Sequence, residues 1–163
     1  MVTEMSSIEE EIIAFLDRHK VKYDIFRHDL VYTCEEMAKY LKTDKNCIAK
    51  SMVVKKSGNG CLLVVLPGNM RVDLFLLARI LNTESVSLAP IKEAERIVGC
   101  SIGCVHPFGN LVQAPTYFDS SLFNSPYLFF NPGSHTKSVK IATQELIEIV
   151  KPTINEFAEP ARR

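Results

Sequence analysis

The sequence predicts an α/β protein of the α+β type, in which a mixed, largely antiparallel sheet is flanked by helices. The length of 163 residues suits one domain, which buries roughly two thirds of its unfolded surface. The composition, 47% hydrophobic and 23% charged, is ordinary for a globular chain. Strand and helix patterns follow each other irregularly, which disfavours a doubly wound parallel sheet. We therefore expect a single compact domain over residues 1–163.

The first predicted elements are a helix, a short strand and a second helix. Apolar residues recur at helical spacing between residues 7 and 20, with acidic residues at the start and basic residues at the end, as the helix dipole favours. Residues 21–28 alternate loosely and predict a strand. Thr33, followed three residues later by Glu36, has the form of a capping box. We expect Thr33 to be the N-cap of a helix that runs through Leu41.

A β-hairpin is the clearest element in the middle of the chain. Residues 48–54 and 61–66 are β-branched and aliphatic, and the glycines and asparagine between them supply the positive φ angles that a hairpin turn needs. Two short helices follow. Asp73 is expected to cap the first, and Pro90 is expected to open the second, which stops at Gly99.

The rest of the chain predicts short strands and one more helix. Prolines and glycines interrupt residues 102–141 repeatedly, which is typical of short strands joined by turns. A last helix is expected over Thr143–Val150. The tail after Lys151 is expected to be loose.

The charge balance excludes a protein that holds nucleic acid through a global positive field, because nineteen basic residues match nineteen acidic ones. Any nucleic-acid contact must be local, and DNA is not an expected partner. One local excess lies between residues 39 and 56, where six lysines face only Asp44. These lysines either contact an anion or merely solvate a helix end and an edge strand. They are Lys39, Lys42, Lys45, Lys50, Lys55 and Lys56.

Five cysteines predict a reducing compartment, since their number is odd and too low for a disulfide scaffold. The N-terminus is acidic and lacks the features of a signal peptide, and no apolar run approaches the roughly 18 residues of a membrane span. We expect a cytoplasmic protein with free thiols and no membrane partner. The cysteines are Cys34, Cys47, Cys61, Cys100 and Cys104.

Lys50 is the first candidate site residue, because its charge interrupts a predicted strand that otherwise looks buried. Strand alternation could simply point the side chain to solvent. The functional interpretation is an ammonium group that faces a cleft and meets a phosphate or ribose oxygen.

The loop over residues 99–109 is the second candidate, because it combines three glycines and a proline with small residues. Such a loop exposes main-chain amides that can converge on an anion, a carbonyl oxygen or a water, as in an oxyanion hole. The alternative is a tight connection that needs glycine for its own geometry.

Cys100, Cys104 and His106 raise the alternative of a metal-dependent hydrolase, because thiolates and imidazole are zinc ligands. Structural zinc sites use two ligand pairs, and here the second pair would have to be improvised from Cys34 and His135. A nucleophilic pair of Cys104 and His106 lacks a group to orient the imidazole. We therefore expect no metal and no cofactor.

His135 is the third candidate, since it follows an Asn-Pro-Gly-Ser turn and precedes a predicted strand. A lone loop histidine is usually only solvated, so the residue carries little weight by itself. The claim of His28 is weaker still.

Eight short motifs occur in one order along the chain. They are Thr33-x-Glu-Glu-x-Ala38, Ile48-Ala49-Lys50-Ser51, Val64-Val65-Leu66-Pro67-Gly68, Val72-Asp73-Leu74, Gly103-x-x-x-Pro107, Asp119-x-x-Leu122, Gly133-x-His135 and Thr143-x-x-Leu146. Each is weak alone, but their order and spacing make the set specific. The set resembles the YbaK/prolyl-tRNA synthetase editing-domain superfamily, with a core over about residues 23–150.

The resemblance implies a free-standing aminoacyl-tRNA deacylase that hydrolyses the ester of a mischarged tRNA. The implied substrate is a tRNA for proline that carries alanine, or another small amino acid such as cysteine or serine. Such enzymes are needed because a synthetase pocket discriminates a missing methylene by only about 1–3 kcal/mol. The implied partners are the 3′ end of an aminoacyl-tRNA and an aminoacyl-tRNA synthetase. The alternative is a non-catalytic module of the same fold that binds tRNA, an amino acid or a synthetase.

The resemblance also implies roles for particular residues. Lys50 matches a lysine that holds the terminal nucleotide's backbone, and Gly103 opens a loop whose amides position the carbonyl and the water, so these two are the expected catalytic residues. His135 matches a histidine that shapes the amino-acid pocket, which favours alanine. Asp119 either orients the site or has a structural role. The expected substrate-binding residues are Ser51, Cys104, Val105, His106, Pro107, Gly133, Ser134, His135, Asp119 and His28.

Overall fold

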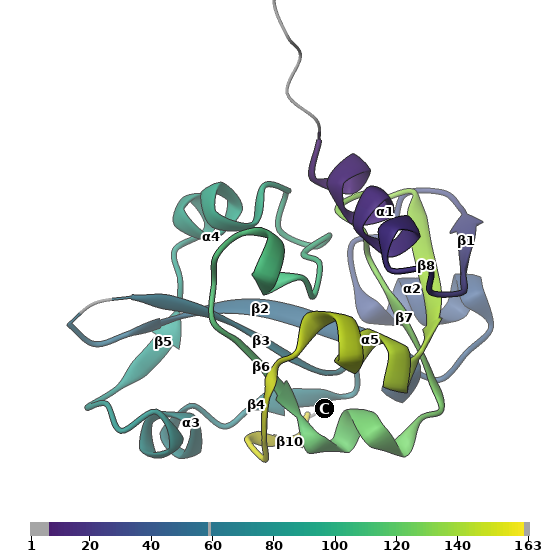
Figure 1. Cartoon of the computed structure of the whole chain (residues 1–163). Coiled ribbons are helices and arrows are strands. Elements are labelled where there is room, and N and C mark those ends of the chain that lie inside the picture. The colour runs from purple at the N-terminus through teal and green to yellow at the C-terminus, as the bar shows by residue number, and fades with distance from the viewer. Residues whose placement is uncertain (1–6, 59, 162–163) are drawn as a thin grey trace, which may run out of the picture.

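The strands of the protein form three sheets in the computed structural model, which describes residues 7–58 and 60–161 (Figure 1). The strands of the largest sheet are β2 (Ala49–Lys56), β3 (Cys61–Pro67), β5 (Val86–Leu88), β6 (Thr116–Asp119) and β9 (Thr153–Asn155). They lie in the order β5-β2-β3-β6-β9. The pairs β5-β2 and β2-β3 are antiparallel, whereas β3-β6 and β6-β9 are parallel. The sheet is therefore mixed, as predicted.

The second sheet consists of β1 (Tyr23–Arg27), β7 (Tyr127–Phe130) and β8 (Lys137–Ala142), in the antiparallel order β1-β8-β7. It lies at the right of Figure 1, next to the end of the large sheet at which β2 begins. A parallel bridge between Ile48 and Phe129 connects the two sheets there. A small antiparallel ribbon contains β4 (Met70–Val72) and β10 (Ala158–Pro160).

The helices begin and end close to their predicted limits. Thr33 accepts a hydrogen bond from the amide of Glu36 at 3.1 Å, and Asp73 caps its helix in the same way. Gly99 ends the fourth helix with a φ of 78°, a conformation that favours glycine. No helix within the described ranges is long and apolar enough to cross a membrane. The α-helices are α1 (Ile8–Arg18), α2 (Cys34–Leu41), α3 (Leu74–Ile80), α4 (Ile91–Val98) and α5 (Thr143–Val150), and the 3-10 helices are η1 (Lys45–Cys47), η2 (Gly109–Leu111) and η3 (Ser120–Asn124).

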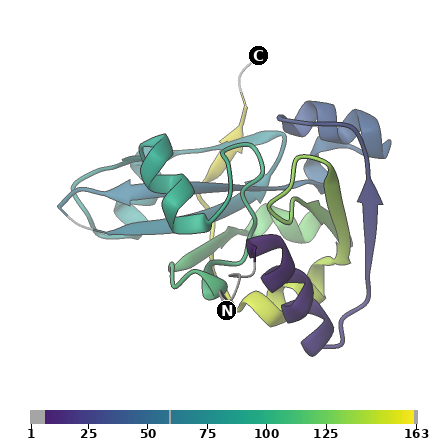
Figure 2. The same cartoon turned by 90° about the horizontal axis from the view of Figure 1, so that it is seen from above.

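Strand β3 is central to the core because both of its faces are covered. Leu63 and Val65 pack into one core with residues of α1, α4 and α5. The alternate residues Leu62, Val64 and Leu66 pack into a second core with residues of α3. Figure 1 shows α4 above the large sheet and α3 below it, and Figure 2 shows α4 lying across the sheet from above. Because both faces are covered, β3 is a continuous apolar run.

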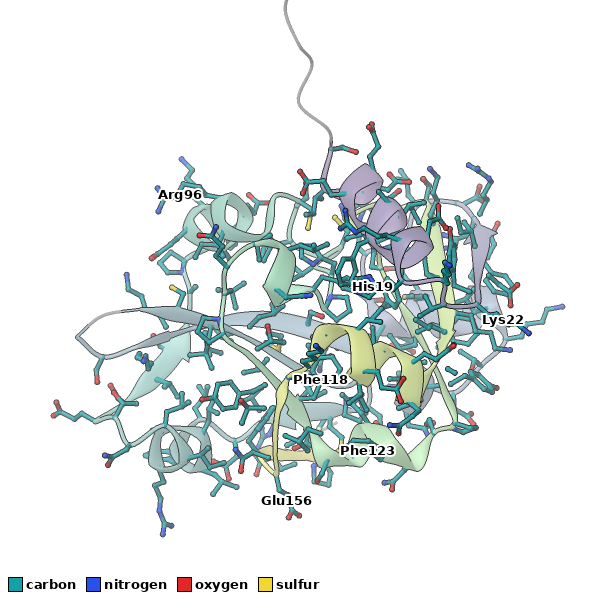
Figure 3. The ribbon with its side chains drawn as sticks, in the orientation of Figure 1. His19, Lys22, Arg96, Phe118, Phe123 and Glu156 are labelled. Atoms are coloured by element: carbon teal, nitrogen blue, oxygen red, sulfur yellow. The ribbon has the colours of Figure 1, made fainter. Side chains whose placement is uncertain are left out.

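Three labelled side chains, from β6, η3 and the segment after β9, show where the core ends. Phe118 of β6 is fully buried and lies inside the molecule in Figure 3. Phe123 of η3 and Glu156 lie at the lower surface in the same view.

The prediction of strands between residues 102 and 115 is wrong, since the structure places turns and η2 there. This segment folds back on itself and on β6 instead of pairing. The amide of Cys104 donates to the carbonyl of Ser101 at 3.1 Å, and a Cβ atom at Gly109 would lie 1.7 Å from Oγ1 of Thr116. Such a close approach is possible only for glycine.

The prediction of a loose tail after Lys151 is also wrong. The tail contains β9 and β10, which extend the large sheet and pair with β4, and the side chain of Phe157 is fully buried in the second core. Short strands with a single large apolar anchor carry little periodic signal in a sequence, which is why the pattern is missed.

Candidate active site

A cavity of about 440 Å³ lies where the two larger sheets meet, within the volume range of small-molecule sites. Its walls come from the segment before α2, the start of α2, η1, the first half of β2, the turn after β3 and the loop after α4. The lining residues are Val31, Tyr32, Thr33, Cys34, Glu35, Met37, Lys45, Ile48, Ala49, Lys50, Ser51, Met52, Gly68, Gly103, Val105 and Asn131.

The first half of β2 has an open edge in this region. Its neighbour β5 pairs only with the second half, from Val54 to Lys56. The carbonyl of Val53 accepts a hydrogen bond from Ala89 on that side, at 3.0 Å. Because main-chain groups alternate in direction along an antiparallel strand, the amide and carbonyl of Ser51 face the same edge. The cavity is therefore bordered by main-chain groups that can bind a ligand.

Lys50 lines the cavity and is not a solvated surface lysine, so the outward-facing alternative is excluded. Its side chain is half-buried, and Nζ donates a hydrogen bond to the carbonyl oxygen of Met70. Burial lowers the pKa of Lys50 below its ordinary value, and the nearby charge of Lys45 acts in the same direction. An anion bound in the cavity would stabilise the charged ammonium group of Lys50 and so raise its pKa again.

Gly103 lies at the mouth of the same cavity in a left-handed conformation, with a φ of 96°. A Cβ atom at this position would lie 3.3 Å from the carbonyl oxygen of Tyr32 and 3.3 Å from Cε1 of His135. The glycine therefore allows the loop to approach both residues closely. Val105, two residues further on, also lines the cavity and is 9% exposed.

His135 packs against Gly103 from outside the cavity lining. Its Nδ1 lies 3.0 Å from the carbonyl oxygen of Val31, and its ring lies 4.6 Å from the ring of Tyr32. Because a carbonyl can only accept, Nδ1 carries the proton, and Nε2 is the acceptor in the neutral ring. The histidine thus fixes the segment before α2 against the glycine loop.

The turn before His135 is held by Asn131. Oδ1 of Asn131 accepts hydrogen bonds from the amides of Gly133 at 3.1 Å and Ser134 at 2.8 Å. A Cβ atom at Gly133 would lie 2.9 Å from Cγ2 of Ile8, so this glycine packs under α1. Asn131 lines the cavity, whereas Gly133 and Ser134 shape the turn behind it.

The other predicted loop residues turn inward. Cys104 is 2% exposed and donates its thiol hydrogen to the carbonyl of Ser101, and Pro107 is buried. His106 is fully buried: Nε2 lies 2.9 Å from the carbonyl of Val98, and Nδ1 accepts a hydrogen bond from the amide of Phe108. None of the three lines the cavity. Substrate-binding roles for them disagree with this geometry.

The residues of the metal-dependent alternative are not arranged as a set of metal ligands. Both ring nitrogens of His106 are bound to main-chain atoms, so neither is free to ligate a metal. Among the residues that the structure describes, no three His, Cys, Asp or Glu side chains are grouped to hold a metal ion. A hydrogen bond from the Cys100 thiol lowers the pKa of Cys104, but this thiol is buried away from the cavity.

Asp119 and His28 lie elsewhere and hold parts of the fold together. Asp119 is 1% exposed and accepts hydrogen bonds from main-chain amides of the C-terminal tail. Nε2 of His28 lies 2.7 Å from Oγ of Ser138, and Nδ1 lies 2.8 Å from the carbonyl of Asp29. These contacts fasten the end of β1 to β8, and the structural alternative for Asp119 is the one that its contacts favour.

The family of the chain follows from comparison with known proteins. A family model for the aminoacyl-tRNA editing domain matches residues 28–149. The chain belongs to the aminoacyl-tRNA editing domain family. The predicted family is thereby confirmed.

Relatives of this editing domain are similar over nearly their whole length. The chain is 29% identical to the multifunctional Ser/Thr-tRNA deacylase ProXp-y of Escherichia coli strain K12, with 98% of this chain and 100% of that protein covered. It is 28% identical to the prolyl-tRNA editing protein ProX of Acetoanaerobium sticklandii, with 91% and 94% covered.

Solved structures confirm the editing-domain fold. The crystal structure of a hypothetical protein superposes with a TM-score of 0.85 at 19% identity and covers 92% of this chain and 100% of that one. A candidate trans-editing enzyme for prolyl-tRNA synthetase superposes with a TM-score of 0.81 at 21% identity and covers 96% and 99%.

Several cavity residues of the editing domain were not predicted as site residues. Tyr32 is 56% exposed at the mouth, and burial raises the pKa of the Cys34 thiol inside. Gly68 follows β3, and its amide donates to the carbonyls of Lys45 and Ile48. The lysine cluster divides: Lys45 and Lys50 line the cavity, whereas Lys55 forms an ion pair with Glu93. The sequence signals for this region were the run of lysines and the motifs that contain Cys34 and Gly68.

Proposed function

We propose that this editing domain hydrolyses the ester bond between a small amino acid and the 3′ end of a tRNA. The observation that carries the proposal is that Lys50, the open edge of β2 and Gly103 border one cavity. The cavity volume of about 440 Å³ suits an aminoacylated ribose better than a larger part of a tRNA.

Lys50 is proposed to bind the terminal nucleotide. Its ammonium group is a compact charge that suits a phosphate or ribose oxygen, and its partial burial strengthens such a contact. Lys45 adds a second positive charge to the same cavity. These two residues would supply the local attraction that the neutral chain lacks overall.

Main-chain groups are proposed to position the reaction. The loop at Gly103 and the edge of β2 at Ser51 offer groups that can orient the ester carbonyl and a water molecule. The water oxygen bonds to the carbonyl carbon, the bond from that carbon to the ribose oxygen breaks, and the ribose oxygen takes a proton. The amino acid leaves as a carboxylate, and the second proton of the water goes to solvent. The Cys34 thiol stays protonated because burial raises its pKa, so it is a poor nucleophile.

The proposed substrate is a tRNA for proline that carries alanine, cysteine or serine. Relatives named as a prolyl-tRNA editing protein and as a Ser/Thr-tRNA deacylase support a small amino acid. His135 is proposed to limit the size of the amino-acid pocket through its contact with Gly103. Similarity to part of proline–tRNA ligases supports a synthetase as a further partner, and the cytoplasm as the place of action.

A panel of mischarged tRNAs tests the proposal. The tRNA for proline is charged in turn with alanine, cysteine, serine and proline, and hydrolysis by the wild type, Lys50→Ala and Lys56→Ala is measured. Lys56 is the matched control, because it lies on the same strand and the same face beyond the cavity. We expect Lys50→Ala to lower kcat/KM by about 100-fold and Lys56→Ala to leave it unchanged.

Two outcomes would overturn parts of the proposal. Equal rates for the wild type and Lys50→Ala would remove Lys50 from the mechanism. If a mischarged tRNA binds and none is hydrolysed, the non-catalytic module is the correct interpretation.

A further inference from the structure

The hydroxyl of Ser51 is a polar atom without a partner. Its Oγ is shielded from solvent and makes no hydrogen bond, and in residues 7–58 and 60–161 it is the only buried side-chain nitrogen or oxygen in this condition. A buried hydroxyl that remains unpaired bears the full penalty of its desolvation. An alanine would avoid that penalty, so the hydroxyl requires an explanation.

The surroundings of Ser51 point to a ligand in the cavity that Ser51 lines. Side chains alternate along β2, so Ser51 shares a face with Ala49 and Val53, both of which are buried in the first core. Val105 of the glycine loop belongs to the same core and also lines the cavity. Ser51 therefore lines the cavity, and its shielded hydroxyl is a polar atom among apolar side chains.

The same alternation places the side chain of Ser51 on the opposite face of β2 from Lys50, the residue proposed to bind the terminal nucleotide. Lys50 projects from the opposite face of β2, where Nζ donates to the carbonyl of Met70. In an aminoacyl ester the amino-acid side chain lies on the far side of the ester from the nucleotide. The ester itself can be held by main-chain groups at the open edge of β2. The amino-acid side chain is then the part of the substrate that reaches Ser51.

We infer that Oγ of Ser51 hydrogen-bonds the side-chain hydroxyl of the aminoacyl group, so that the enzyme removes serine in preference to alanine. This inference rests on the proposed function and narrows its substrate class. A serine hydroxyl can both donate and accept, so it matches a substrate hydroxyl in either direction. A pocket built to bind a hydroxyl rejects an analogue without it more strongly than an apolar pocket rejects a size difference.

The test compares seryl- and alanyl-ester hydrolysis on one tRNA body, so that only the aminoacyl group differs. kcat/KM is measured for the wild type, Ser51→Ala and the control Ser87→Ala, whose serine is exposed on β5. We expect Ser51→Ala to lower the ratio of seryl to alanyl kcat/KM by roughly 10- to 100-fold. Ser51→Thr, which keeps a hydroxyl, should retain more of the ratio than Ser51→Ala. Ser87→Ala should leave it unchanged.

The outcomes separate this inference from the proposed function. If Ser51→Ala lowers both activities equally, or changes neither, the inference is wrong while the deacylase remains. If the wild type hydrolyses neither ester, nor any other mischarged tRNA, the proposed function itself has failed. Because Ser51→Ala deletes only an unpaired buried hydroxyl, its thermal unfolding temperature should be equal to or higher than that of the wild type, and such a result excludes misfolding as the cause.

Discussion

Oδ1 of Asp119 accepts a hydrogen bond from the main-chain amide of Phe157 at 2.8 Å. The amide of Ala158 donates to the same oxygen at 2.8 Å, and the other carboxylate oxygen accepts from the amide of Ser121 at 3.0 Å. The carboxylate thus joins the end of β6 to the tail that carries Phe157 into the core. Its position explains why the Asp-x-x-Leu motif lies apart from the cavity.

Asp119→Asn should destabilise the fold and leave the chemistry intact. The asparagine side chain is neutral, so the hydrogen bonds from the main-chain amides of Phe157 and Ala158 lose their charged acceptor. This loss should lower the free energy of unfolding by about 2–3 kcal/mol. Urea unfolding measures the loss, and exposed Asp24→Asn is the control. Below the unfolding transition we expect kcat/KM within about twofold of the wild type, whereas a large loss of activity at unchanged stability would show that Asp119 orients the site.

Gly103→Ala should impair hydrolysis. The new Cβ would lie 3.3 Å from Tyr32 and from His135, and the left-handed φ of 96° disfavours alanine. We expect kcat/KM to fall by about 10- to 100-fold as the loop shifts. Gly58→Ala is the matched control, since Gly58 also has a positive φ of 89° but a Cβ there meets no described atom within 4 Å. If both variants keep full activity, the loop position is not important for hydrolysis.

His106 should make stability depend on pH. Burial lowers its pKa from 6.5 to about 4, so the unfolded chain binds a proton in this window while the folded protein does not. The stability that neutral, buried His106 contributes is fully present above pH 6.5 and is lost as the pH falls toward about 4. Between pH 7 and pH 5 the loss should be about 2 kcal/mol. His106→Gln should reduce this pH dependence, and urea unfolding at both pH values checks it; an unchanged slope would assign the effect to other groups.

Thr33→Ala should weaken the wall of the cavity. The variant removes the N-cap of α2, whose first residues line the cavity, at a cost of about 1 kcal/mol. Ser7→Ala removes the corresponding cap of α1, which lies outside the cavity. Thermal unfolding should report similar losses for the two, while only Thr33→Ala should raise KM. Equal KM values would mean that the start of α2 does not contact the substrate.

Much of the local structure could be predicted because its causes are local. The capping box at Thr33 and the cap at Asp73 form hydrogen bonds within three residues, so the pattern alone is sufficient. Lys50, Ser51, Gly103 and Val105 were predicted as site residues and line one cavity. Their proximity could not be derived from periodicity, because it depends on how two sheets meet.

The sequence by itself determined the helices, the hairpin and the motifs that place the chain in the editing family. Only the tertiary structure decided which motif residues face the cavity. His106 turns into the core because Val98 and Phe108 satisfy its nitrogens, and Asp119 serves a tail 38 residues further along the chain. The physical reason is that burial and long-range hydrogen bonds depend on the packing of distant segments, whereas spacing along the chain reports only neighbours.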